Sequence, residues 1–477
     1  MTSTTRVHAF ADDALGDLDA VGVADAISAG DLSPAEAVDT AISRIEAVNQ
    51  RLNALVTAGF EQARERAAGP RAVDPSLAAF DGVPTLVKDN VDLAGLPTRH
   101  GSAAVLDPRP AKTSEPVVRQ LLASGAIALG KSSLPEFGFN ASTEFAEAEP
   151  TRNPWHTDYS CGASSGGSAA LVAAGAVPFA HANDGGGSIR IPAAACGLVG
   201  LKFTRGREVV SAAGRSMPVN ILSNGVVTRS VRDQAAYLAS VDRHRPNARL
   251  PRVGRVEGPS ERRLRVGLIL DSLTEPTDDT TRAAVLDVAR QLEKDGHTVV
   301  EIGLPVDDSF ADHFLHYWAL LAFSMHQFGS RLLHTKYDGR KNDPLTLGLA
   351  RELRRRPWRT PAAIKALKAS EHVYRNTFVA EQVDVILSPT LGYVTPKLGH
   401  LSPANGFETL MPRLLNYAAF TPANNASGGP AISLPLAQTD DGRPVGVHFS
   451  ATHGDERTLL ELAFELEQSI GFARIQD

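Results

Sequence analysis

The sequence is poor in the features that mark secreted, membrane-spanning and cysteine-metal proteins. Its only 2 cysteines, Cys161 and Cys196, form no CxxC pair, so we expect neither a disulfide framework nor a cysteine metal site. Residues 1–20 contain no apolar segment of the kind found in signal peptides. No apolar run reaches the ~18 residues that a membrane span requires. These absences predict a protein of the reducing cytoplasm with no membrane segment.

An excess of basic charge is also absent. The 477 residues include 48 Lys and Arg against 54 Asp and Glu, a formal net charge of −6. Bulk electrostatics therefore gives no argument for nucleic acid or an anionic membrane as a partner. One basic stretch, residues 351–368, is expected to be a solvated helix face. No His, Cys and carboxylate residues cluster with metal-ligand spacing, so we predict no metal and no other cofactor.

Helical and strand-like segments alternate along the chain. A Ser33-Pro34-Ala35-Glu36 capping box precedes apolar residues at helical spacing. Short apolar runs such as GVPTLVK, RLRVGLILD and VDVILSPT predict strands between the helices. This alternation predicts a layered α/β architecture. No linker rich in Pro, Gly and Ser divides residues 1–477, so we expect one domain, and residues 241–263 are the best candidate for a boundary or a surface excursion.

Two short motifs match patterns of well-known enzyme classes. Residues 125–132, GAIALGKS, match the phosphate loop GxxxxGK[ST], but a helix precedes them and the residues between the glycines are strand-like, so we reject a nucleotide site. Residues 162–166, GASSG, match the nucleophile elbow of α/β-hydrolases, which needs a strand directly upstream and a late histidine. A polar and aromatic segment lies upstream, while His448 and His453 are available. An esterase that uses Ser164 therefore stays an alternative.

A segment rich in glycine and serine, residues 162–204, and a strand that ends in Lys88 carry the strongest chemical signal. A serine hydroxyl is a poor nucleophile until a base takes its proton. The segment contains no His–Asp pair, but a lysine can be the base if burial lowers its pKa from about 10.4. The run DGGGS permits unusual backbone conformations in which successive N–H groups point at one oxygen. Such an arrangement is an oxyanion hole.

These segments resemble the amidase signature family. The resemblance spans most of the chain and is carried by GVPTLVKDNVDLAGLPTRHGS (82–102), GKSSLPEFG (130–138), TRNPW (151–155), the segment 162–204 and SGGPAISLP (427–435). Within the family, NDGGGSIRIPA looks closest to nylon-oligomer and aryl acyl-type amidases. The resemblance implies a large mixed β-sheet with helices on both faces. It also implies a signature core at residues 80–235 and a variable, substrate-shaping region at residues 305–425.

The family's catalytic residues fall on three positions of this sequence. The nucleophile falls on Ser188, the bridging serine on Ser164 and the base on Lys88, and the two serines are 24 positions apart. The oxyanion hole falls on the backbone amides of Gly185, Gly186, Gly187 and Ser188. The implied reaction is acyl transfer, in which the proton of Ser188 passes through Ser164 to Lys88. In the family a cis peptide bond precedes the bridging serine, so we expect a cis bond between Ala163 and Ser164.

The sequence departs from the family pattern around these residues. Threonine is usual where Asn183 and Gly185 stand, glycine where Ala163 stands, proline where Cys161 stands and glutamine where His448 stands. None of these positions belongs to the triad. In the same segment, Asp184 and Arg190 are expected to be scaffold of the loop and not catalysts.

The substrate pocket is expected to be apolar, with Phe139, Tyr317 and Trp318 as candidate wall residues. The predicted function is therefore an amidohydrolase that acts on a small-molecule or oligomeric amide and releases a carboxylate and an amine or ammonia. A homodimer is compatible with the sequence. Two further alternatives are the A subunit of a tRNA-dependent amidotransferase, which works with partner subunits, and a non-catalytic module that binds anions through its glycine-rich loops.

Overall fold

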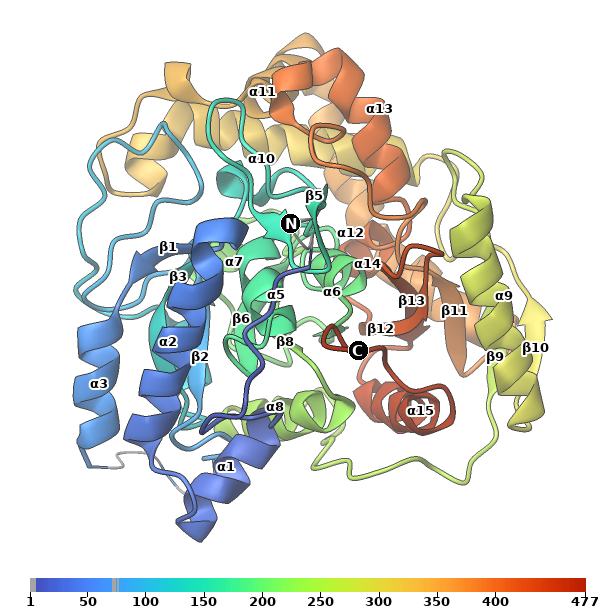
Figure 1. The fold of residues 1–477 in the computed structure, drawn as a ribbon. Coiled ribbons are helices and arrows are strands. Elements are labelled where there is room, and N and C mark those ends of the chain that lie inside the picture. The colour runs from blue at the N-terminus through green and yellow to red at the C-terminus, as the bar shows by residue number, and fades with distance from the viewer. Residues whose placement is uncertain (1–5, 71–73, 75–76) are drawn as a thin grey trace.

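An eight-stranded mixed β-sheet forms the centre of the protein (Figure 1). The computed structural model describes residues 6–70, 74 and 77–477. The strand order is β10-β9-β11-β13-β12-β7-β8-β6, and only the β9–β10 and β9–β11 pairs are parallel. The strands are β6 (Phe179–Asp184), β7 (Val199–Lys202), β8 (Ser223–Thr228), β9 (Arg265–Leu268), β10 (Thr298–Glu301), β11 (Val385–Pro389), β12 (Ala431–Gln438) and β13 (Pro444–Ala451). The predicted large mixed sheet is confirmed.

Helices cover both faces of this sheet, as predicted (Figure 1). On one side α8 (Val231–His244) and α15 (Glu456–Ser469) contact each other and the central strands, while α6 (Arg190–Cys196) lies on the other side against β12 and β13. The remaining α-helices are α1 (Ala20–Ala29), α2 (Pro34–Leu52), α3 (Phe60–Ala68), α4 (Pro116–Leu122), α5 (Gly166–Ala173), α7 (Ala212–Ser216), α9 (Asp279–Lys294), α10 (Phe310–Leu332), α11 (Pro344–Arg355), α12 (Thr360–Ala380), α13 (Phe407–Tyr417) and α14 (Pro422–Ser427). The capping box predicted at Ser33 is present at the start of α2.

A second, three-stranded sheet carries the predicted base. Its order is β1-β3-β2, with β1 at Leu55–Ala58, β2 at Pro84–Lys88 and β3 at Ile127–Ser132. Every residue of β2 is buried, so Lys88 enters the protein interior at the end of the strand. Residues 127–132 form a strand and not a phosphate-binding loop, which agrees with rejecting the nucleotide site. A short hairpin, β4 (Arg152–Asn153) and β5 (His156–Ser160), leads into the segment that contains Ser164.

Two surface segments behave as the sequence indicates. Residues 241–263 run from the end of α8 to β9, and strands on both sides of this segment belong to one sheet, so it is a surface excursion. The basic stretch at 351–368 covers the end of α11, the 3-10 turn Pro357–Arg359 and the start of α12, and most of its arginines are exposed. No helix in the described part of the chain combines the length and apolarity needed to cross a membrane.

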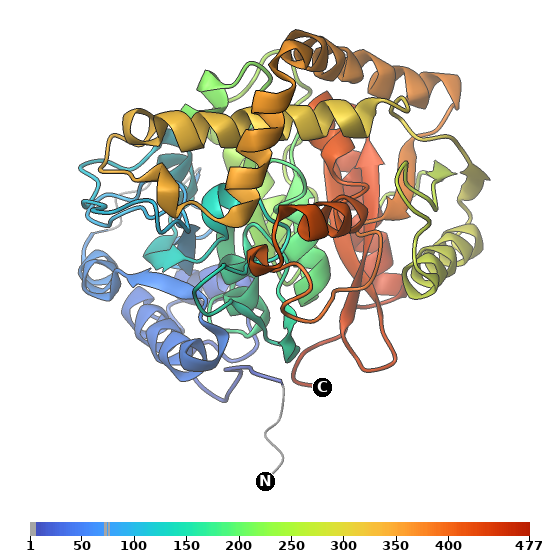
Figure 2. The same ribbon diagram turned by 90° about the horizontal axis from the view of Figure 1, so that it is seen from above.

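Helix α10 belongs to residues 305–425, the segment expected to shape the substrate pocket. In Figure 2 this long helix runs across the molecule from the side of α9 to the side of the N-terminal helices. It makes extensive contacts with α11 and α12, so the three helices form one packed layer. Trp318 lies on α10, and its ring contacts the ring of Phe139. The part of α10 that carries Trp318 therefore lies beside Phe139.

Candidate active site

Lys88 and Ser164 are in direct contact inside the protein. Lys88 is 0% exposed, and its Nζ lies at hydrogen-bond distance, 2.7 Å, from Ser164 Oγ. Ser164 follows a cis peptide bond from Ala163, which confirms the expected cis geometry, and stands just before α5. Burial holds the pKa of Lys88 well below its usual value, although the Asp184 carboxylate acts in the opposite direction. A neutral amine can accept a proton, so the contact is of the kind that general base catalysis requires.

Ser188 lies in the loop between β6 and α6, beside Ser164 and Ser165. Its carbonyl accepts a hydrogen bond of 2.6 Å from Ser165 Oγ. Ser188 is 6% exposed and lines a cavity together with Gly138 and Ala163. A Cβ added at Gly138 would lie 2.8 Å from Ser164 Oγ, so Ser164 also reaches this part of the site. The Ser188 hydroxyl makes no hydrogen bond with any described residue, so the Lys88–Ser164 contact is the part of the predicted relay that is formed.

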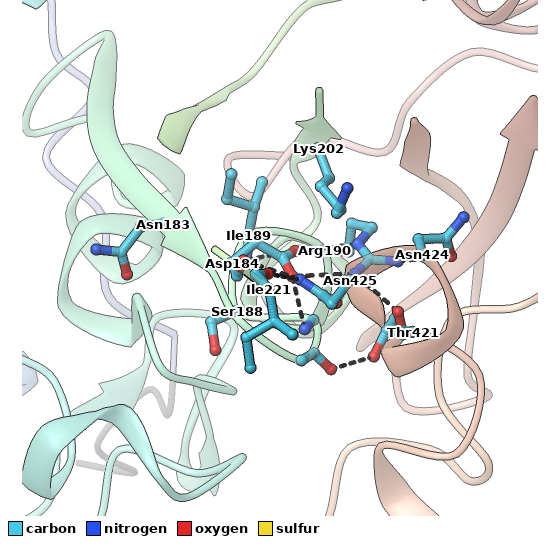
Figure 3. Close-up of polar contacts among 12 residues, drawn as sticks. Asn183, Asp184, Ser188, Ile189, Arg190, Lys202, Ile221, Thr421, Asn424 and Asn425 are labelled. Atoms are coloured by element: carbon cyan, nitrogen blue, oxygen red, sulfur yellow. Dashed lines mark hydrogen bonds and ion pairs between the residues drawn. The ribbon is translucent and has the colours of Figure 1, made fainter. Parts of the chain in front are cut away.

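A fully buried ion pair supports the loop that carries Ser188 (Figure 3). Arg190 Nη2 lies 3.0 Å from Asp184 Oδ1, and both side chains are 0% exposed. Asp184 also accepts hydrogen bonds from the N–H groups of Gly187 at 2.7 Å and Ile189 at 3.1 Å, the residues on either side of Ser188. Burial opposes ionisation, but Arg190 holds the pKa of Asp184 below its usual range. Both residues therefore act as scaffold of the loop, as expected from the sequence.

The same loop is also held by α14, from the C-terminal part of the chain. Thr421 Oγ1 donates to the carbonyl of Gly186 at 2.6 Å, and Asn425 Nδ2 donates to the carbonyl of Asp184 at 2.8 Å. Arg190 donates to Asn424 Oδ1 at 3.0 Å. These three partners are not among the residues predicted from the sequence, although they directly precede the motif SGGPAISLP at 427–435. Their position beside a family motif is the one signal that could have drawn attention to them.

The three glycines expected at the oxyanion hole differ in whether their backbone N–H group is free to bind an oxyanion. The N–H of Gly187 donates to Asp184, so it is engaged in holding the loop and does not fit the expected oxyanion role. Gly187 has a φ of +130°, and a Cβ there would lie 2.2 Å from Thr421 Oγ1, so the position requires glycine. A Cβ at Gly186 would lie 3.6 Å from the Trp318 ring, and one at Gly185 would lie 3.0 Å from the Leu222 side chain. The amides of Gly185, Gly186 and Ser188 remain the candidates for binding an oxyanion.

An apolar cavity opens beside Ser188. Phe139 and Trp318 line it, as expected, and no charged residue of the described chain does. The Trp318 ring stacks against Phe314 at a centroid distance of 5.7 Å and meets Phe139 edge-on at 5.6 Å. These three rings form an aromatic wall opposite the glycine loop.

Tyr317, expected in the cavity wall, lies elsewhere. It is 1% exposed, and its hydroxyl donates to the carbonyl of Val219 at 2.6 Å within a separate core cluster. It does not line the cavity beside Ser188. Successive residues of an α-helix point about 100° apart, because a turn holds about 3.6 residues. Since Trp318 faces the cavity, its neighbour Tyr317 is directed into the core.

The two histidines that a nucleophile elbow would need do not reach Ser164. His448 lies on β13, where its Nε2 faces Arg190 Nη1 at 3.1 Å, and burial followed by the charge of Arg190 lowers its pKa well below the usual value. His453 Nε2 faces the carbonyl of Ser427 at 2.9 Å. The Ser164 hydroxyl is instead hydrogen-bonded with Lys88. The interpretation of residues 162–166 as a nucleophile elbow therefore has no histidine to support it. Within residues 6–70, 74 and 77–477, no group of three or more His, Cys, Asp or Glu is arranged to hold a metal ion.

Curated relatives match nearly the whole chain. The putative amidase AmiC of Mycobacterium tuberculosis (strain ATCC 25618 / H37Rv) is 48% identical over 472 residues, which cover 99% of this chain and 98% of that protein. The 6-aminohexanoate-cyclic-dimer hydrolase of Pseudomonas sp. (strain NK87) is 32% identical and covers 95% of this chain, with 94% of its own length matched. A glutamyl-tRNA(Gln) amidotransferase subunit of Geobacillus kaustophilus (strain HTA426) is 33% identical, covers 93% of this chain and matches over 95% of its own length, but is a more distant match than AmiC.

Solved structures and the family profile agree with these relatives. A 6-aminohexanoate cyclic dimer hydrolase complexed with substrate superposes with a TM-score of 0.85 at 29% identity, covering 96% of this chain and 98% of its own. A bacterial aryl acylamidase of the amidase signature family superposes with a TM-score of 0.80 at 25% identity, covering 95% and 96%. The sequence profile of the family Amidase matches residues 36–460. The chain therefore belongs to the amidase family and is a hydrolase of amide C–N bonds.

Proposed function

We propose that the chain hydrolyses carboxamides through an acyl-enzyme on Ser188, with Ser164 as the bridging serine and Lys88 as the base. The observation that carries this proposal is the 2.7 Å hydrogen bond between Lys88 Nζ and Ser164 Oγ, buried beside a cavity that Ser188 lines. No histidine contacts Ser164 in the described chain, so Lys88 is the base that the geometry offers. Its lowered pKa favours the neutral form that can accept a proton.

The reaction follows from these positions. Ser188 Oγ attacks the amide carbonyl carbon, while its proton passes to Ser164 and the Ser164 proton passes to Lys88. The amides of Gly185, Gly186 and Ser188 stabilise the oxyanion, and losing one such donor typically costs about 3 kcal/mol. When the C–N bond breaks, the relay returns the proton to the leaving nitrogen. Water then attacks the ester, releases the carboxylate and restores Ser188. Each transfer brings two heavy atoms within about 2.6–3.2 Å in the substrate complex.

We also propose that the substrate is a neutral, apolar amide. The cavity beside Ser188 has no charged wall among the residues that the structure describes, and Phe139, Phe314 and Trp318 give it an aromatic side. Such a cavity favours aryl and aliphatic groups, because a charged group would lose its hydration without gaining a partner. The names of the cyclic-dimer hydrolase and aryl acylamidase relatives support uncharged amides of this kind. A panel in which anionic amides were much the best substrates would overturn this proposal.

We further propose that the chain acts in the cytoplasm without partner subunits. The two unpaired, buried cysteines support a reducing compartment. The more distant match to the amidotransferase subunit makes a partner-dependent role the second candidate. The purified chain should hydrolyse simple amides alone. Activity that appears only after a second protein is added would favour the amidotransferase role.

Covalent labelling tests the nucleophile. A fluorophosphonate should form an adduct with the wild-type protein, and peptide mapping should find it on Ser188. The Ser188→Ala variant should lose both the adduct and amide hydrolysis. An adduct on Ser164 would favour the elbow mechanism instead, and an unlabelled wild type that still binds phosphate would favour the anion-binding module.

A further inference from the structure

The buried amine of Lys88 has three oxygen neighbours, and two of them belong to one residue. Its Nζ lies 2.7 Å from Ser164 Oγ, 2.7 Å from Asn183 Oδ1 and 3.4 Å from the Asn183 carbonyl oxygen. The side-chain carbonyl and the main-chain carbonyl of Asn183 therefore both face the amine. In Figure 3 the Asn183 side chain points away from the cluster of Asp184 and Arg190, so the loop scaffold does not use it.

The hydrogen-bonding capacity of these neighbours sets the orientation of the N–H groups and the lone pair of the neutral Lys88 amine. A neutral lysine amine has two N–H groups and one lone pair. Both oxygens of Asn183 are carbonyl oxygens, which only accept hydrogen bonds, whereas the Ser164 hydroxyl can also donate. The two N–H groups therefore point at Asn183, and the lone pair points at Ser164. That is the direction from which the proton has to arrive.

The orientation of the Asn183 amide is set in turn by Asn90. Asn183 Nδ2 donates to Asn90 Oδ1 at 2.9 Å, and Asn90 Nδ2 donates to Asn183 Oδ1 at 3.2 Å. Turning the Asn183 amide over would place donor against donor and acceptor against acceptor in this pair. Asn183 is 6% exposed, so water offers little replacement for the lost hydrogen bonds.

We infer that Asn183 is a positioning residue, which holds the neutral Lys88 amine with its lone pair toward Ser164, and that Asn90 fixes the Asn183 amide for this purpose. The inference rests on the proposed function, because it assigns Asn183 to the same proton relay. The ionisable groups around Lys88 are His181 and Asp184 on β6, Lys131 on β3 and Asp89, which follows Lys88 and pairs with Lys131 at 3.1 Å. A change at Asn183 leaves all four in place.

The test is the pH dependence of fluorophosphonate labelling at Ser188, which needs no amide substrate. In Asn183→Asp a carboxylate faces the amine, which favours the protonated lysine and moves the midpoint of the labelling profile up by about 1–3 pH units. In Asn183→Leu the amine loses an acceptor, so the midpoint moves down and the plateau rate falls roughly tenfold or more. Asn49→Asp is the matched control. Asn49 Oδ1 accepts hydrogen bonds from two backbone N–H groups, those of Ala54 and Leu55, which a carboxylate also accepts, so its profile should match the wild type.

The two variants give opposite shifts if Asn183 acts on the amine. A merely structural role would lower labelling equally at every pH. Far-UV circular dichroism identifies a variant that does not fold, and the other variant then decides. An unchanged midpoint in the folded variants overturns the positioning role and leaves the proposed function standing, since Ser188 is still labelled. A wild-type protein that is not labelled at Ser188 overturns the proposed function itself, and the inference with it.

Discussion

Replacing Asp184 by asparagine removes one charge of a fully buried ion pair and leaves Arg190 without its counter-ion. Asp184 accepts hydrogen bonds from the Arg190 guanidinium at two atoms, from the amides of Gly187 and Ile189, and from Asn425. Asparagine has one acceptor oxygen and brings a donor group into a site made of donors. Breaking a buried pair in this way typically costs about 3–5 kcal/mol, so the free energy of unfolding should fall by that amount.

Urea denaturation followed by tryptophan fluorescence measures this loss. Asp271→Asn is the matched control, because Asp271 pairs with Arg282 at the surface, where its side chain is 48% exposed and the pair is worth below about 1 kcal/mol. The double variant Asp184→Asn, Arg190→Met removes both charges and should recover part of the stability, since no uncompensated ion remains.

The Asp184 variant should also lose activity. The N–H groups on either side of Ser188 are held by this carboxylate, so kcat should fall even at temperatures where the variant is folded. Equal losses of stability in Asp184→Asn and Asp271→Asn would refute the reasoning, as would full activity in the folded Asp184 variant.

Three further predictions concern the Lys88 amine, the backbone of Gly187 and the two cysteine thiols. Because neutral Lys88 is the proposed base and burial lowers its pKa, kcat should rise as the pH rises through that pKa. Lys88→Ala should lower kcat by several orders of magnitude at pH values above that pKa and should abolish this pH dependence. Gly187→Ala should destabilise the protein by about 1–3 kcal/mol in thermal unfolding, because the φ of Gly187 is +130° and the new methyl group would meet the Thr421 hydroxyl. Gly258→Ala is the control: a Cβ at Gly258 has open space, so stability should change by less than about 0.5 kcal/mol. Cys161 and Cys196 are buried, and burial raises the pKa of the Cys161 thiol to about 12. A disulfide reagent that reacts with thiols should therefore modify these cysteines only after denaturation. Rapid reaction of the native protein would contradict the observed burial.

The parts of the site that lie close together in sequence, or that carry family motifs, could be predicted. The strand ending in Lys88, the cis bond before Ser164 and the glycine loop at Ser188 followed from local pattern and resemblance. The strand follows from a local apolar pattern, whereas the cis bond and the role of the glycine loop followed from the resemblance to the family. The mixed sheet and its helical layers followed in the same way from alternating periodicity and family likeness.

The contacts that depend on tertiary packing could not be predicted. Thr421 and Asn425 hold the serine loop across more than 230 residues of sequence, and no periodicity links such distant positions. The expected place of Tyr317 in the cavity wall is wrong because the phase of a long helix with apolar residues on several faces cannot be read from composition. The sequence alone marks Asn183 as a departure from the family, but its hydrogen bond to Lys88 depends on the geometry of two different sheets.

The hold of α14 on the serine loop has a consequence for biosynthesis. Every proposed catalytic residue has been translated once residue 188 is added, yet Thr421, Asn424 and Asn425 arrive more than 230 residues later. Chains grow from the N-terminus at about 5–20 residues per second, so this interval lasts on the order of ten seconds or more. During it, the nascent polypeptide carries the reactive serine without the groups that shape its surroundings. We therefore expect hydrolytic competence to be a late event of synthesis.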